Sequence, residues 1–295
     1  MEKQVRVILW ALPRTLSTAF LKCMNGVPDS KMFYEPYTTA YLFGPDRPYD
    51  SAPRPSDSSE CGSVDVAGKP CDAVSGFDDS ICTYKWVKEQ LEAPFQGKQL
   101  IFCKDMAYCL NKSYEHLPQG YKFIFLIRHP KKVIPSWKKL ISDYSRKKVE
   151  DFVLDELEPP IMPPEIGYGE LLELFEYIKQ QGLDAEPIVI DADDLLADPH
   201  AIMSACCKKT GVPYNDNLLT WEEGGRAVEN WAVSKNLKYV IADAGSFDNV
   251  KRSSCFQKPD AGPEVSGGSE QSPDVQRFVE KCMPLYSKLY EVRLK

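Results

Sequence analysis

Short apolar runs alternate with longer amphipathic stretches over most of the 295-residue chain. The apolar runs are brief and rich in β-branched residues, which indicates buried strands. They predict strands over residues 5–10, 31–34, 99–103, 123–127 and 187–191. The amphipathic stretches predict helices near residues 16–26, 83–93, 131–146, 168–181, 200–210 and 274–290. Strands that alternate with helices are typical of βαβ units, so we expect an α/β fold with a five-stranded, mostly parallel sheet flanked by helices in three layers.

Two stretches interrupt this alternation, at about residues 44–80 and 253–273. The first is rich in Pro, Gly, Ser and Asp and has too few apolar residues to bury a face of its own. Both are expected to be loose insertions in a single domain that spans residues 1–295. Long loops inside a compact domain are often functional, so either is a candidate cover for a substrate.

The first strand leads into a turn with candidate chemistry. The apolar run from Val5 to Leu9 stops at Pro-Arg-Thr-Leu-Ser-Thr (13–18), where a helix is expected to begin. The free N–H groups and the dipole of a helix N-terminus favour a bound phosphate. Arg14 adds a positive charge there, and Ser17 and Thr18 add hydroxyl groups. The alternative is an ordinary turn in which Thr15 or Ser17 caps the helix.

A second strand ends in a similar way. The apolar run from Phe123 to Ile127 is followed by Arg128, and Ser136 lies eight residues after that arginine. Two strands that each end near an arginine and enter a hydroxyl-bearing helix indicate a ligand with two phosphate groups. The first turn is not a Walker A loop, because residues 8–18 contain neither glycine nor lysine. This disfavours a kinase or hydrolase of the P-loop type.

With these two motifs, the chain resembles the sulfotransferase superfamily, whose members use 3′-phosphoadenosine 5′-phosphosulfate as sulfuryl donor. The resemblance implies a P-loop-NTPase-like architecture. It also implies that the 5′-phosphosulfate and the 3′-phosphate are bound by Arg14, Thr15, Ser17, Thr18, Arg128 and Ser136. Residues 188–199 and 273–294 resemble the family's fifth core strand and closing helix. Leu16 departs from the family's glycine in the first turn, which matters if that position needs a positive φ. Ala192 departs from a tyrosine in the fifth-strand pattern.

Family members also need a base for the acceptor proton. Cytosolic members carry a histidine after the third strand, but the matching position here is Met106, which cannot accept a proton. The segment with Glu35 and Pro36 resembles the Glu-Pro motif of the Golgi-type carbohydrate and N-sulfotransferases. Pro36 is expected to hold Glu35 extended at the end of its strand, facing the ligand crevice. The alternative for Glu35 is a solvated carboxylate without a catalytic role.

The resemblance thus implies Glu35 as the catalytic base and Arg14 and Lys104 as positive contacts to the reacting group. Asp105 is expected either to orient Lys104 or to share the base role. The reaction implied is in-line transfer to a hydroxyl or amine of a small-molecule or carbohydrate acceptor. The alternative is a catalytically silent nucleotide-binding or scaffolding protein of the same fold, which Leu16 and the missing histidine favour.

The composition of the chain argues against several other classes of protein. The net charge of −7 and the lack of a long basic run argue against nucleic-acid binding. No apolar run approaches the length of a membrane span, and no signal peptide precedes the first strand, so we expect a cytoplasmic protein. The three histidines are scattered, so no metal site is expected. The oligomeric state stays open, a homodimer included.

Overall fold

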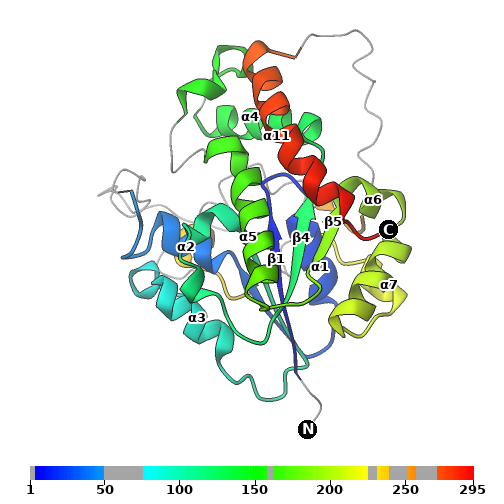
Figure 1. Ribbon diagram of the computed structural model, residues 1–295. Helices are drawn as coiled ribbons and strands as arrows, with labels where there is room; N and C mark the ends of the chain where they lie inside the picture. The colour runs from blue at the N-terminus through cyan, green and yellow to red at the C-terminus, as the bar shows by residue number, and fades with distance from the viewer. Residues whose placement is uncertain are drawn as a thin grey trace.

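The computed structural model describes residues 4–49, 76–145, 147–157, 163–224, 231–238, 252–256 and 271–295. Its centre is one parallel sheet with the strand order β2-β3-β1-β4-β5 (Figure 1). The strands are β1 (Val5–Ala11), β2 (Ser30–Tyr34), β3 (Leu100–Met106), β4 (Lys122–Ile127) and β5 (Ile188–Asp191). The prediction of five mostly parallel strands is confirmed, because all four strand pairs are parallel.

All six predicted helices are present. They are α1 (Ser17–Asn25), α3 (Tyr84–Glu92), α4 (Pro130–Tyr144), α5 (Tyr168–Gln180), α7 (Pro199–Thr210) and α11 (Pro273–Glu291). Among the elements that the structure describes in full, the short helices α2 (Pro36–Leu42) and α6 (Ala192–Ala197) were not predicted, and each begins directly after a strand. Short 3₁₀ segments are η3 (Asp79–Ile81), η4 (Ala107–Leu110), η5 (Tyr114–His116), η6 (Val149–Asp151), η7 (Leu154–Glu156), η8 (Pro164–Gly167) and η9 (Asp216–Leu219).

The sheet is buried on both faces. Ile8 and Trp10 of β1 point into one apolar cluster, which helices α3, α5 and α11 complete. Val7 and Leu9 point into the other cluster, which α1 and α7 complete. Alternate residues of a strand face opposite sides, so a strand covered by helices on both sides reads as a continuous apolar run. This explains why the five strands were recognisable in the sequence.

The register brings the carboxyl ends of neighbouring strands together. Ala11 of β1 lies opposite Met106 of β3 and Leu126 of β4, and Tyr34 of β2 lies opposite Lys104. β1 is the central strand: β3 and β2 lie on one side of it, and β4 and β5 lie on the other. In open parallel sheets ligands bind at this edge, where the strand order reverses. The segments that follow β1, β2, β3 and β4 therefore share one edge of the sheet.

The two predicted insertions are described in part. Residues 50–75 and 257–270 lie outside the described residues. The described end of the first stretch is anchored, because Phe77 forms a parallel bridge with Ser234. Cys255, in the second stretch, forms an antiparallel bridge with Thr220. The prediction of one domain with two loose insertions stays a prediction.

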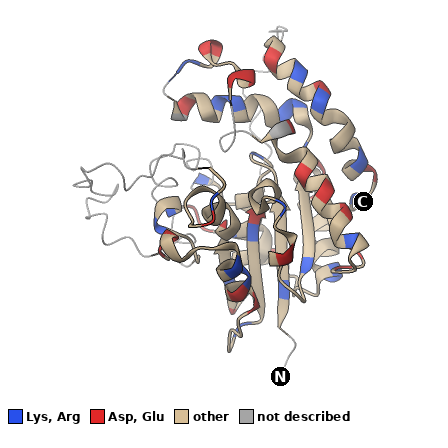
Figure 2. Cartoon of the chain, turned by 60° about the vertical axis from the view of Figure 1, so that its left-hand side comes forward, with Lys and Arg blue, Asp and Glu red and all other residues tan. Residues whose placement is uncertain are grey.

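Basic and acidic side chains are interspersed along the described helices, as α11 shows clearly (Figure 2). None of the helices within the described ranges is both long enough and apolar enough to cross a membrane.

Candidate active site

The turn after β1 has an unusual backbone. Arg14 and Leu16 both adopt left-handed conformations, with φ of 66° and 67°. Leu16 is the N-cap of α1, and no side chain caps this helix. The Thr15 hydroxyl donates to the Leu12 carbonyl at 2.7 Å, so it closes the turn. The interpretation as an ordinary capped turn, with Thr15 or Ser17 as the cap, is therefore wrong. The departure from glycine at Leu16 also has a cost, because a left-handed conformation is strained by about 1 kcal/mol in residues other than glycine.

The two predicted phosphate motifs meet in space. The Arg14 Nε donates to the Ser136 Oγ at 2.9 Å, although the two residues are 122 positions apart. The Arg128 Nη1 donates to the Arg14 carbonyl at 3.3 Å. Ser17 and Thr18 lie in the first turn of α1, which begins three residues after Arg14. The structure thus brings the arginines of both motifs and Ser136 together at the carboxyl edge of β1 and β4.

Arg128 is held firmly but keeps one donor unused. Its carbonyl accepts a hydrogen bond from the Tyr168 hydroxyl at 2.5 Å, and its side chain is only 12% exposed. Its Nε lies 3.5 Å from the Asp193 Oδ1, an ion-pair contact. That buried Nε has no hydrogen-bond partner among the described residues. A buried donor without an acceptor costs free energy, so the position suits an anionic oxygen.

Asp193 is a site residue that the sequence analysis missed. It lies in the first turn of α6, and its carboxylate also contacts Lys132 Nζ at 2.9 Å. An aspartate beside two cations lowers the positive charge at the predicted 3′-phosphate position. The available signal was the acidic cluster that follows β5, from Asp191 to Asp194.

Glu35 and Lys104 form a buried ion pair. Their side chains are 8% and 5% exposed, and Lys104 Nζ donates to Glu35 Oε1. The backbone adds a further link, because the Glu35 N–H donates to the Lys104 carbonyl at 2.8 Å. The structure thus places the predicted base beside a predicted positive contact, at the ends of two paired strands.

The prediction that Glu35 is extended is wrong. Glu35 has φ 53° and ψ 48°, a left-handed conformation, and it is the N-cap of α2. Pro36 disfavours only the right-handed helical region for the residue before it, so the left-handed region is also allowed. Pro36 itself occupies the first turn of α2, where its fixed φ suits a helix. The sharp turn into α2 therefore replaces the expected extended end.

Among the described residues, the hydrogen bonds of Asp105 do not include one to Lys104, so the orienting role is not seen, while its share in the base role stays a prediction. Asp105 is fully buried, and its carboxylate accepts from the N–H groups of Tyr37 at 2.6 Å and Thr38 at 3.0 Å. The Thr38 hydroxyl donates to it at 2.7 Å, and the Met106 N–H at 2.9 Å. Burial and the charge of Glu35 raise the pKa of Asp105 to about 7. Asp105 anchors the start of α2, and it points away from Lys104 because neighbouring strand residues face opposite sides.

Comparisons with known proteins agree with this fold. Residues 177–289 match the model of a sulfotransferase domain. The matched region contains β5, α6, α7 and most of α11, and excludes both phosphate motifs. A sulfotransferase from Alicyclobacillus acidocaldarius has a TM-score of 0.52 at 11% identity and covers the whole chain, with 98% of its own length aligned. A sulfotransferase domain from the curacin biosynthetic pathway aligns with a TM-score of 0.45 at 16% identity, over 95% of this chain and 97% of its own.

Two curated relatives from Arabidopsis thaliana are not named as sulfotransferases. Branched-chain-amino-acid aminotransferase-like proteins 2 and 1 are 26% and 27% identical over 285 and 283 residues. The alignments cover 95% of this chain but only 40% of each relative, so the chain spans about two fifths of their length. The domain match over residues 177–289 shows that this part of the chain is similar to a sulfotransferase domain, and the chain as a whole shares the fold of a solved sulfotransferase.

Proposed function

We propose that the protein transfers a sulfuryl group from 3′-phosphoadenosine 5′-phosphosulfate to a hydroxyl or amine of a small-molecule or carbohydrate acceptor. One observation supports this most strongly. Arg14 and Arg128, taken from two motifs far apart in the sequence, meet at the carboxyl edge of the sheet around Ser136. Two arginines at that edge suit a ligand with two anionic groups. We extend the proposal to a cytoplasmic location, as the sequence predicts.

The residues present fit such a donor. Arg14, Thr15, Ser17 and Thr18 would surround the phosphosulfate, together with the uncapped first turn of α1. Arg128 and Ser136 would bind the 3′-phosphate, and the Arg128 Nε, which contacts Asp193 but has no hydrogen bond among the described residues, would donate to it. When bound, the donor supplies the sulfuryl group and a phosphate leaving group.

Arg14 would stabilise negative charge at the reacting centre. An arginine stays protonated in proteins, so its role is electrostatic and it does not act as an acid. Its guanidinium is positioned by Ser136 through the Nε, which leaves the side chain oriented before a ligand arrives. Donors that are already oriented stabilise a transition state without a reorganisation cost.

Glu35 would accept the proton of the acceptor. Lys104 orients this carboxylate, because the two groups share a buried ion pair. When Glu35 takes up the proton, Lys104 loses its counter-charge and becomes available to negative oxygens of the reacting group. The ion pair would thus provide both a proton acceptor, Glu35, and a positive charge, Lys104, at the same point of the site.

The donor assignment is tested by titrating 3′-phosphoadenosine 5′-phosphate into the full chain in a calorimeter. We expect binding without Mg²⁺, and a loss of about tenfold or more in affinity for Arg128→Ala, because a charge-assisted contact is removed. Lys85→Gln is the matched control, since Lys85 is an exposed cation of α3 paired only with Glu89 in the described contacts. A folded chain that does not bind the nucleotide contradicts the proposal. Binding of ATP that requires Mg²⁺ would instead support a P-loop kinase or hydrolase.

A further inference from the structure

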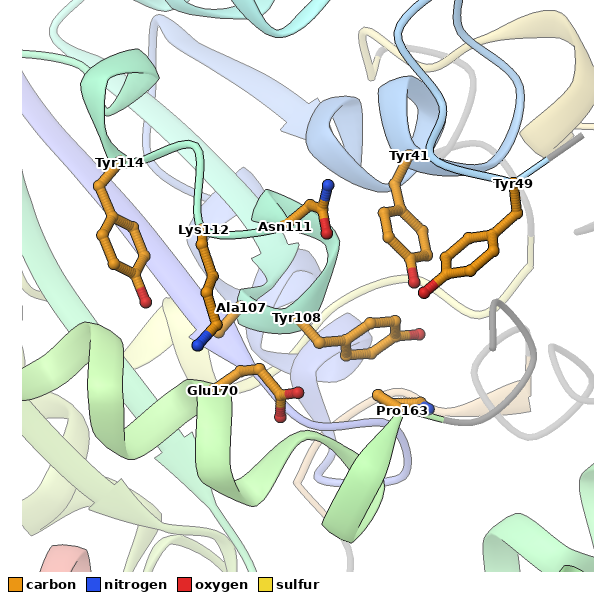
Figure 3. A pocket seen from close by; sticks show the side chains of 9 residues that line it. All are labelled: Tyr41, Tyr49, Ala107, Tyr108, Asn111, Lys112, Tyr114, Pro163 and Glu170. Carbon is orange, nitrogen blue, oxygen red and sulfur yellow. The ribbon is translucent and has the colours of Figure 1, made fainter. Parts of the chain in front are cut away.

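A small pocket lies beside the candidate active site, between α2, η4 and α5 (Figure 3). Its volume is about 90 Å³, room for a small head group rather than a sugar ring. Figure 3 shows side chains from three separate parts of the chain around it. Its polar lining consists of four tyrosines, one amide, one carboxylate and one ammonium group: Tyr41, Tyr49, Tyr108, Tyr114, Asn111, Glu170 and Lys112.

The pocket and the Glu35–Lys104 pair share the same edge of the sheet. Tyr108 lies two residues after the end of β3, and Tyr41 lies in α2, the helix that Glu35 begins. The rings of Tyr41 and Tyr108 meet edge to face, with 5.9 Å between their centroids. A molecule held in the pocket is therefore close to the strand ends that carry the candidate base.

Glu170 is the carboxylate that lines the pocket, and Lys112, the cation that lines it too, is paired with Glu173. Its Oε2 is buried and has no hydrogen-bond partner in the described part of the chain. Two other carboxylates nearby have cations of their own: Glu173 is 3.1 Å from Lys112, and Glu165 is 3.5 Å from Lys281. Burial and the charges of Glu165 and Glu173 raise the pKa of Glu170, whereas Lys112 lowers it. A buried carboxylate without a partner is costly, so the site favours an incoming cation.

The backbone around the pocket is strained on two sides. Asn111 and Lys112 both have positive φ, at 49° and 59°, and so do Glu165 and Ile166, at 48° and 54°. The next residue, Gly167, packs so closely on Tyr108 that an added Cβ would lie 3.0 Å from the ring. Strained residues that persist in a fold are concentrated at ligand sites. Of these strained residues, Asn111 and Lys112 line the pocket itself.

We infer that the pocket binds the alkylated ammonium group of the acceptor. Tyrosine rings attract such cations through the negative charge on their faces, and Glu170 supplies the counter-charge. The inference rests on the proposed function, since it names the acceptor class. The sulfated group would be a hydroxyl elsewhere in the same molecule, because a bound ammonium has no lone pair with which to attack.

The test compares choline with its uncharged isostere 3,3-dimethylbutan-1-ol. Both are titrated into the full chain, with and without saturating 3′-phosphoadenosine 5′-phosphate. We expect choline to bind about tenfold or more tightly than the isostere, as a desolvated cation between aromatic rings should. Glu170→Gln should remove most of this difference, and Tyr49→Leu should weaken choline binding. Glu176→Gln is the matched control, because Glu176 is an exposed carboxylate on the same helix.

The measurements of choline binding test the pocket, and the measurements of nucleotide binding test the proposed function, so the two can fail separately. Equal binding of choline and the isostere overturns the inference, as does choline binding that Glu170→Gln leaves unchanged. The absence of choline binding to a chain that still binds the nucleotide also overturns it and leaves the donor assignment intact. Choline binding to a chain that does not bind the nucleotide supports the pocket and contradicts the proposed function.

Discussion

The substitution Glu35→Gln tests the candidate base, and the structure gives it two separate consequences. Gln keeps the size of the side chain but cannot take a proton, so transfer should fall by roughly 100-fold or more, the usual share of general-base catalysis. Affinity for 3′-phosphoadenosine 5′-phosphate should stay nearly unchanged. The second consequence concerns stability, because Lys104 is only 5% exposed and loses its counter-charge.

Removing one partner of a buried ion pair costs about 3–5 kcal/mol. The Gln amide oxygen still accepts a hydrogen bond from Lys104, so we expect the lower end, about 3 kcal/mol. For a protein of this size that loss corresponds to a fall of roughly 5–10 °C in Tm. The double variant Glu35→Leu with Lys104→Met removes both charges and should recover most of the lost stability, yet it should stay inactive.

The assay is single-turnover transfer of labelled sulfate, measured well below the Tm of each variant, together with calorimetric unfolding. Unchanged turnover of Glu35→Gln would refute the base assignment. Asp105 would be the next candidate in the sequence, although its contacts with the start of α2 argue against it. If the Glu35→Gln variant is inactive but its Tm is unchanged, Glu35 remains the candidate base. The stabilising buried ion pair between Glu35 and Lys104 would then be contradicted.

Three further predictions follow from single contacts. In urea unfolding, Leu16→Gly should be more stable than Leu16→Ala by about 1 kcal/mol, because glycine tolerates the positive φ of this position better than alanine does. Equal stability of the two variants would contradict backbone strain at Leu16. Asp193→Asn should tighten 3′-phosphoadenosine 5′-phosphate binding by about threefold or more, with a larger gain at low salt, because it removes a negative charge beside Arg128; unchanged affinity would exclude Arg128 from the phosphate site. Burial alone would raise the pKa of Asp274, but hydrogen bonds from Lys138, Ser272 and the Leu154 N–H lower it overall. Since the folded pKa lies below the unfolded value, the stabilisation is present above about pH 4 and is lost as the pH falls further. Asp274→Asn should therefore show a smaller loss of Tm on acidification than the unchanged chain, and an equal loss would contradict it.

The sheet could be predicted because its strands are buried on both faces and its longer helices are amphipathic. Each of these elements therefore has a pattern that is visible within its own residues. The helices α2 and α6 lack such a pattern, because each is seven residues or fewer and is nearly all buried or begins in an acidic cluster. Their starts depend on contacts from elsewhere, such as the carboxylate of Asp105 at the first turn of α2.

The candidate site was only partly predictable for the same reason. Arg14, Arg128 and Ser136 were found from spacing, but their direct contact depends on the pairing of β1 with β4. Asp193 was missed because its contact with Arg128 joins the ends of β4 and β5. The tyrosine pocket is assembled from three separate segments, so no local pattern in the sequence could indicate it.

The most direct test of the central claim is transfer of labelled sulfate from 3′-phosphoadenosine 5′-phosphosulfate to a pooled acceptor panel that includes hydroxyl-bearing alkylammonium compounds. The account predicts that the unchanged chain forms one sulfated product for each 3′-phosphoadenosine 5′-phosphate released. It also predicts that Arg14→Ala lowers this transfer far more than it lowers nucleotide binding, because the charge is needed most in the transition state. A folded chain that binds the nucleotide but sulfates no acceptor would contradict the account and indicate a catalytically silent nucleotide-binding protein of the same fold.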